Sequence, residues 1–203
     1  MIAIIDYGMG NLKSIQRALV ELNAEVTISN DPRTIAEADR LVLPGVGAFA
    51  DGMKNLTSLN LDKIIKELTV RKKRPLLGIC LGMQLMATKG NEGGRYQGLG
   101  IIPGEVKRLE PTAKNERIPH VGWNEVHLLR PSALFMKIPD DSDFYFVHSY
   151  HLIPESKEVV VGTTDYCDGF ASVVNSGNIW GVQFHPEKSG SLGAAVLRNF
   201  IAF

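Results

Sequence analysis

The sequence predicts an α/β protein with an open, mostly parallel β-sheet that is flanked by helices and extended by antiparallel strands. In the first half, short apolar runs alternate with amphipathic segments, as in strand–helix–strand units whose right-handed crossovers give parallel pairing. In the second half, short strand-like runs follow one another with turns between them. A chain of 203 residues can bury one substantial core, so we expect a single domain over residues 1–203.

Four short apolar runs predict the parallel strands, at residues 2–5, 25–28, 40–43 and 76–80. Runs of this length and composition are typical of strands buried between helices. Glycine-bearing turns follow three of them, at residues 8–10, 45–47 and 78–82. Because the carboxyl ends of parallel strands share one edge of the sheet, where ligands bind, we expect a functional site at these turns.

Capping residues and apolar spacing predict the helices between these strands. Asn11 can cap a helix whose buried face carries Leu12, Ile15, Leu19 and Leu22. Asp31-Pro32 has the cap-then-proline form of a short helix start. A further helix has its apolar face at Leu61, Ile64, Ile65 and Leu68 and ends near Arg71-Lys-Lys-Arg74, and another begins near Leu81.

The second half predicts the antiparallel extension and a closing helix. Its strand-like runs span residues 105–109, 121–129, 144–148, 159–163, 171–174 and 179–184. The helix covers residues 191–202, with Leu192, Val196 and Phe200 along one side.

Composition and charge exclude several classes of function. Lysine plus arginine and aspartate plus glutamate both number 22, so no net charge attracts nucleic acid or an anionic membrane. The basic run 71–74 is most simply a solvated helix end. No apolar run approaches the ~20 residues of a membrane span, and the N-terminus lacks a signal-peptide pattern. With two widely spaced cysteines, the sequence indicates a cytoplasmic protein without a disulfide framework.

The segment Gly78-Ile-Cys80-Leu-Gly82 is the cysteine counterpart of the G-x-S-x-G nucleophile elbow. A sharp strand-to-helix turn would lift the thiol above the sheet edge, and the glycines leave room for the tightly folded backbone. The start of the next helix would stabilise a thiolate, and the N–H of Leu81 could donate to an oxyanion. Alone, this segment does not distinguish a nucleophile from a buried structural cysteine.

The segment Trp180–Glu187, WGVQFHPE, supplies a base. A strand runs into His185-Pro-Glu187, and proline prevents the strand from pairing further. Because residues two apart in an extended segment point the same way, Glu187 could bond one imidazole nitrogen while the other faces Cys80. The carboxylate would fix the tautomer of the ring and stabilise the imidazolium, so we predict a catalytic triad of these three residues.

Together, the elbow and His185-Pro-Glu187 resemble the class I (triad) glutamine amidotransferases, and the similarity covers essentially the whole chain. Within that family, four segments resemble the glutaminase subunits of imidazole glycerol phosphate synthases: Asp6-Tyr-Gly-Met-Gly-Asn11, Leu43-Pro-Gly-Val-Gly47, Gly82-Met-Gln84 and Val121-Gly-Trp-Asn124. The resemblance implies a flavodoxin-like fold and hydrolysis of L-glutamine without a cofactor. The thiolate attacks the side-chain amide, ammonia leaves, and water hydrolyses the thioester. His148 and His151 lack a zinc-site spacing, so we expect no metal.

The resemblance also assigns roles around the substrate. The residues that it implies hold glutamine are Gly47, Gln84, Glu92 and the main chain of Ser149 and Tyr150. Val46 would provide an oxyanion N–H beside that of Leu81 only after its peptide flips, in response to ligand at the partner's site.

The implied partner is a (β/α)8-barrel cyclase, which would form a heterodimer with this chain. It would use the ammonia to make imidazole glycerol phosphate and an aminoimidazole carboxamide ribotide. The implied contact residues are Asn11, Trp123, Asn124 and Lys188.

Simpler interpretations of these segments stay open on the sequence. The segment 45–50 fits a dinucleotide-binding pattern, but Pro44 occupies the tight turn and no ribose-binding acid follows, so we expect no NAD site. Its glycines could serve chain reversal alone. The segment 6–11 could be only a helix entry, and residues 123–124 could be core and turn. Cys167 lacks an elbow and is interpreted as incidental.

Three other functions compete with the leading one. The chain could serve a synthase of the anthranilate or aminodeoxychorismate type, although such relatives tend to have histidine where this chain has Met83. It could be a free-standing cysteine hydrolase that needs no partner. A binding subunit without activity is disfavoured because all three triad residues are present.

Overall fold

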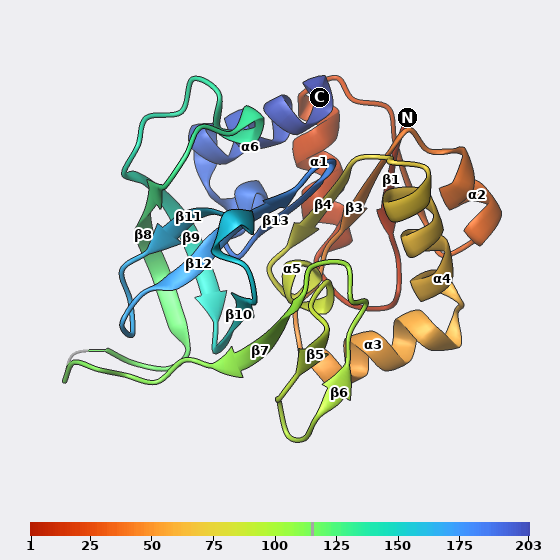
Figure 1. Ribbon diagram of the computed structural model, residues 1–203. Helices are drawn as coiled ribbons and strands as arrows, with labels where there is room; N and C mark the ends of the chain where they lie inside the picture. The colour runs from red at the N-terminus through yellow and green to blue at the C-terminus, as the bar shows by residue number, and fades with distance from the viewer. Residues whose placement is uncertain (115) are drawn as a thin grey trace.

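The computed structural model describes residues 1–114 and 116–203 (Figure 1). Its strands are β1 (Ile2–Ile5), β2 (Val26–Ser29), β3 (Arg40–Leu43), β4 (Leu76–Ile79), β5 (Lys89–Gly90), β6 (Tyr96–Gln97), β7 (Gly104–Arg108), β8 (His120–Leu128), β9 (Ser142–His148), β10 (Tyr150–Pro154), β11 (Val160–Thr164), β12 (Phe170–Ser176) and β13 (Ile179–Val182). Its α-helices are α1 (Leu12–Glu21), α2 (Pro32–Glu37), α3 (Phe49–Ser58), α4 (Leu61–Lys66), α5 (Leu81–Leu85) and α6 (Gly190–Ala202).

The larger sheet has nine strands in the described part of the chain, in the order β2-β1-β3-β4-β13-β12-β11-β8-β9. Pairing is parallel from β2 through β13 and antiparallel from β13 to β9. The predicted α/β class is therefore confirmed, with β1 to β4 of the first half in parallel and an antiparallel extension from the second half. The expectation that residues 179–184 belong only to that extension is wrong, because β13 also pairs in parallel with β4. The last strand, β13, lies in the middle of the sheet between β4 and β12.

Strands β10, β7, β5 and β6 form a second, four-stranded sheet. The expectation that residues 105–109 extend the larger sheet is wrong, because β7 pairs with β10 and β5 instead. The apolar pattern of β7 indicates only that one of its faces is buried. Val106 and Leu152, paired across β7 and β10, are packed in the same core cluster as Leu85 of α5.

Helices cover both faces of the parallel strands, and the strands supply a core on each side. Successive residues of β1 alternate between the two cores, with Ile4 in one and Ile5 in the other. The first core also holds α1 and α6, which lie beside each other in Figure 1, and the second holds α2 to α5. This two-sided burial explains why β1 and β4 have no polar side chain, whereas the edge strand β2 is half-buried and carries Thr27 and Ser29.

Local signals place the starts of α1, α2 and α4 correctly. Asn11 caps α1 by accepting a hydrogen bond from Ser14 N at 3.3 Å, and Asp31 caps α2 through the N–H groups of Arg33 and Thr34. The predicted helix at Leu61 forms α4 and continues as a π-helical turn over Glu67–Arg71. Beyond it, Arg74 is not simply solvated, because its guanidinium donates to the carbonyls of Ala36 and Ala38 at the C-terminal end of α2.

Candidate active site

Cys80 occupies a strained turn between β4 and α5. Its φ is +52° and its ψ is −110°, a combination that is unfavourable for a residue with a side chain. A Cβ atom at Gly78 would lie 2.9 Å from Gly82 O, and one at Gly82 would lie 1.8 Å from Leu43 O. Both flanking glycines are therefore required for the turn to pack against itself and against the end of β3.

The neighbouring strand brings His185 to the same edge. β13 pairs with β4 in parallel, Val182 opposite Ile79, and Cys80 N donates to Val182 O at 2.8 Å. His185 follows three residues later, and its Nδ1 lies 2.8 Å from Glu187 Oε1. The expected extended geometry is wrong at this point, since a 3-10 turn at Pro186–Lys188 brings the carboxylate to the imidazole.

The His185–Glu187 pair is almost completely buried, with 3% and 2% of its side chains exposed. Burial lowers the pKa of His185, but the adjacent Cys80 and Glu187 side chains outweigh it and raise that pKa to about 9. No hydrogen bond of ordinary geometry joins His185 Nε2 to another residue of the described chain. This nitrogen is therefore available to exchange a proton with a ligand, while the carboxylate favours the imidazolium.

Two further groups contact the thiol. Cys80 Sγ lies 3.8 Å from Val147 O, and Gln183 Nε2 donates to it from 3.6 Å. The amide oxygen of Gln183 in turn accepts from Gln84 Nε2 at 3.1 Å. The sequence analysis missed Gln183, although its position two residues before His185 places both side chains on the same side of an extended segment.

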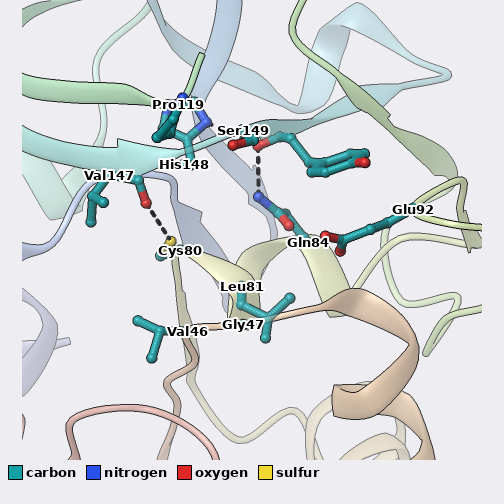
Figure 2. A pocket seen from close by; sticks show the side chains of 11 residues that line it. Val46, Gly47, Cys80, Leu81, Gln84, Glu92, Pro119, Val147, His148 and Ser149 are labelled. Carbon is teal, nitrogen blue, oxygen red and sulfur yellow. Dashed lines mark hydrogen bonds between the residues drawn. The ribbon is translucent and has the colours of Figure 1, made fainter.

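A cavity of about 270 Å³ opens beside the thiol. Eight of the predicted site residues line it: Val46, Gly47, Cys80, Leu81, Gln84, Glu92, Ser149 and Tyr150. Figure 2 shows Val46 and Gly47 on one side of Cys80, and Val147, His148 and Ser149 on the other. His185 and Glu187 do not line this cavity.

Hydrogen bonds hold two of the lining residues in place. Gln84 Nε2 donates to Tyr150 O at 2.7 Å, which joins α5 to the start of β10. The carboxylate of Glu92 accepts from Phe49 N at 2.8 Å, at the first turn of α3. Both side chains are thus anchored by main-chain groups from other elements.

Tyr7 fixes the loop that carries Val46. The phenol is buried and donates to Pro44 O at 2.6 Å, and a Cβ atom at Gly45 would lie 2.2 Å from its oxygen. Burial raises the pKa of Tyr7, and the nearby Cys80 raises it further, so the phenol stays protonated and can donate. The sequence analysis treated this segment as a turn and did not single out Tyr7.

The four predicted partner-contact residues are not equally exposed. Trp123 is 57% exposed, which makes its interpretation as a core residue wrong. Its ring lies 6.1 Å from that of Tyr145, and Lys188 Nζ lies 5.6 Å from the centre of the Tyr145 ring. Asn11 is exposed at the start of α1, whereas Asn124 is half-buried and bonded to His120.

Other candidate features contribute little to the site. In the described residues, no group of three or more His, Cys, Asp and Glu side chains could hold a metal ion. Cys167 lies in the turn before β12, and burial and Glu116 raise its pKa, which makes it a poor nucleophile. Residues 1–114 and 116–203 contain no helix long and apolar enough to cross a membrane.

Comparisons with known proteins point to one family. The family model of class-I glutamine amidotransferases matches residues 3–203. A Moorella thermoacetica protein named imidazole glycerol phosphate synthase subunit HisH is 54% identical over 199 residues, which cover 98% of this chain and 93% of that protein. An Aquifex aeolicus protein of the same name is 48% identical over 198 residues, with 97% and 94% covered.

Two solved structures share the fold. PurLQS from Thermotoga maritima matches with a TM-score of 0.72 and 16% identity, covering 99% of this chain and 97% of that one. The glutaminase domain of Trypanosoma brucei CTPS matches with a TM-score of 0.67 and 16% identity, covering 99% and 92%. At these identities, the match concerns the fold alone.

Proposed function

Because the chain belongs to the class I glutamine amidotransferases, we propose that it is the glutaminase subunit of an imidazole glycerol phosphate synthase. The names of the relatives support this assignment. The main structural support is the placement of Cys80 at a strained turn beside a cavity, with the buried His185–Glu187 pair on the adjacent strand end. We take residues 1–203 as one glutaminase domain, acting in the cytoplasm.

The chemistry starts from a thiolate–imidazolium pair formed by Cys80 and His185. The sulfur attacks the side-chain amide carbon of glutamine, and the N–H groups of Leu81 and Val46 receive the oxyanion. His185 gives its proton to the leaving nitrogen, so ammonia departs and a γ-glutamyl thioester forms. Water then attacks the thioester while His185 accepts its proton, and glutamate leaves as the thiolate is restored. Glu187 orients the ring and stabilises its charged form throughout.

The cavity walls would hold the substrate. Gln84 and Glu92 reach the cavity from α5 and from the loop after β5, and both are anchored by the bonds described above. Gly47 and the main chain of Ser149 and Tyr150 complete the walls, with the last two binding the amino-acid end of glutamine. We assign Gln183 as a neutral donor to the sulfur, which would favour the thiolate without adding charge.

Ammonia would pass to a (β/α)8-barrel cyclase that makes imidazole glycerol phosphate and an aminoimidazole carboxamide ribotide. Trp123 and Lys188, packed on Tyr145, would form the contact surface together with Asn11. Asn124 alternates with Trp123 along β8, so it would support this surface from behind through its bond to His120. Val46 is 43% exposed, in a loop whose Gly47 has a φ of +120°. We propose that ligand binding at the cyclase reorients the Val46 peptide and completes the oxyanion site.

The test is labelling by an electrophilic glutamine analogue, with peptide mass mapping, for the chain alone and with the cyclase and its nucleotide ligand. We expect modification of Cys80, with the partner raising labelling and glutamine hydrolysis by about two to three powers of ten, the value of one oxyanion donor. The variant C80A should lose hydrolysis but leave use of added ammonium salts by the cyclase intact. Labelling at Cys167, or equal turnover with and without the cyclase, would contradict the proposal. Stimulation by a different acceptor enzyme alone would assign the chain to another synthase.

A further inference from the structure

Two buried histidines face each other at the cavity wall, which His148 helps to line. His120 on β8 and His148 on β9 are opposite residues in the antiparallel pair, and only 4% and 6% of each is exposed. His120 Nδ1 lies 3.0 Å from His148 Nε2. The His120 ring is stacked on Tyr166, with centroids 4.0 Å apart, and on Phe146, at 5.1 Å. The two rings are therefore held in one relative orientation.

The partners of this pair fix where each proton lies. His148 Nδ1 is 2.9 Å from Tyr150 O, and a carbonyl only accepts, so Nδ1 carries the hydrogen. Burial lowers the pKa of His148 to about 3 and that of His120 to about 4, so both rings are neutral near pH 7. A neutral imidazole has one N–H, so His148 Nε2 must accept and His120 Nδ1 must donate.

The same assignment of hydrogen-bond donors and acceptors extends to Asn124 on β8. His120 Nε2 is left as an acceptor, and the Asn124 amide nitrogen lies 3.3 Å from it. The Asn124 oxygen accepts from Glu125 N at 2.9 Å, which orients the amide with its nitrogen toward His120. A directed chain of hydrogen bonds therefore runs from Asn124 through His120 and His148 to Tyr150 O.

The inner end of this chain acts on the segment that lines the cavity, residues 147–150. Tyr150 O also accepts from Gln84, and Val147 O contacts Cys80 Sγ. Figure 2 shows His148 between Val147 and Ser149 on the wall above the thiol. Any displacement of the His148 ring would shift main-chain atoms that contact both the nucleophile and a predicted substrate residue.

The outer end lies on a strand with two different faces. Val121 and Trp123 of β8 are 56% and 57% exposed, on the face where we place the partner. His120 and Asn124 alternate with them and point to the opposite side of the strand. Movement of β8 on docking would therefore be transmitted directly to the imidazole of His120.

We propose that His120 and His148 are positioning residues that couple the partner-facing strand β8 to the cavity wall at residues 147–150. This inference rests on the proposed function, because it needs a partner that stimulates glutamine hydrolysis. Neither imidazole exchanges a proton with the substrate. Their role is to fix where Val147 O and Tyr150 O lie when the partner is bound.

The test compares three variants by the factor with which the cyclase and its ligand stimulate hydrolysis. H120F keeps a stacked ring but removes the donor to His148. H120N keeps an amide donor near the position of Nδ1 but loses the ring. H127F is the matched control, because His127 lies on the same strand and pairs with Asp141 and Asp165 away from this chain of bonds.

We expect H120F to lower the stimulation factor about tenfold, the effect of one buried donor removed, while H120N and H127F stay within about threefold of the parent. Affinity for the cyclase should not change, since His120 is buried. If the His120 ring only filled space, H120F would keep a larger stimulation factor than H120N, and that order would overturn the inference. If all three variants match the parent, the inference fails while the proposed function stands. A parent protein without partner-stimulated hydrolysis would overturn both.

An independent readout is ¹⁵N NMR, which should show the Nδ1–H tautomer at both histidines. A proton on His148 Nε2 would contradict the proposed direction of the hydrogen bonds between His120 and His148.

Discussion

At the residue scale, the reactivity of Cys80 depends on side chains that sequence motifs do not reveal. The elbow and His185-Pro-Glu187 predict the nucleophile and its base because both motifs encode backbone turns. The motifs do not identify Gln183 and Tyr7, because each acts through a tertiary contact. Gln183 contacts the Cys80 sulfur, and Tyr7 contacts Pro44 O. The spacing from His185 indicates the side of the segment on which Gln183 lies, but the group that either residue contacts depends on which strands become neighbours.

Replacing Tyr7 with phenylalanine should weaken the loop that carries Val46. The change leaves the buried Pro44 carbonyl without its donor, which costs about 1–3 kcal/mol in the free energy of unfolding. We also expect reduced glutamine turnover with the partner, because Val46 follows Pro44 by two residues. Urea unfolding and glutaminase assays of Y7F measure the two effects. Tyr96 is 40% exposed, so Y96F should stay within about 0.5 kcal/mol of the parent. Equal unfolding midpoints for the two variants would contradict this role of Tyr7.

At the scale of elements, the apolar runs predict the strands of the larger sheet to within about two residues at each end. The sequence analysis did not identify α3, whose sequence FADGMKNLTS has a glycine at its centre and starts inside a segment that resembles a glycine loop. Strands β5 and β6 contain two residues each, too few for any periodicity. The second sheet could not be predicted either, since β7 pairs with β10 across the intervening strands β8 and β9.

Replacing Gly82 with alanine should test the packing of α5 against β3. The added Cβ would lie 1.8 Å from Leu43 O, where only backbone movement can relieve the clash. We expect a loss of at least about 3 kcal/mol in the free energy of unfolding, or failure to fold. Gly177 has a φ of +61° and open space around it, so G177A should cost only about 1–2 kcal/mol. Similar losses for both variants, measured by urea denaturation, would show that the elbow tolerates a side chain.

At the scale of the whole molecule, buried histidines should make the fold sensitive to mild acid. Burial lowers the pKa values of His120 and His151 to about 4 and that of His148 to about 3. Their unfolded value is near 6.5, so the unfolded chain binds more protons below that pH. The stability that they contribute is fully present above about pH 6.5 and is lost as the pH falls towards 4.

Urea unfolding at several values between pH 6.5 and pH 4.5 measures this loss. Each histidine contributes at most about 1.4 kcal/mol per pH unit. Unperturbed carboxylates have pKa values of about 4, so histidine titration dominates the part of the window above about pH 5. In H148F, the pH slope should decrease by about one proton. A free energy of unfolding that does not change across the window would contradict the buried neutral state of these rings.

The position of β13 has a consequence for the nascent polypeptide during synthesis. The strand lies between β4 and β12 in the sheet, yet along the chain it follows every other strand of the described residues. Until β13 emerges from the ribosome, no strand joins β4 to β12, and Cys80 has no base beside it. Reactivity therefore has to wait until residues 179–187 have been made, and a polypeptide that stops before them carries an unreactive thiol.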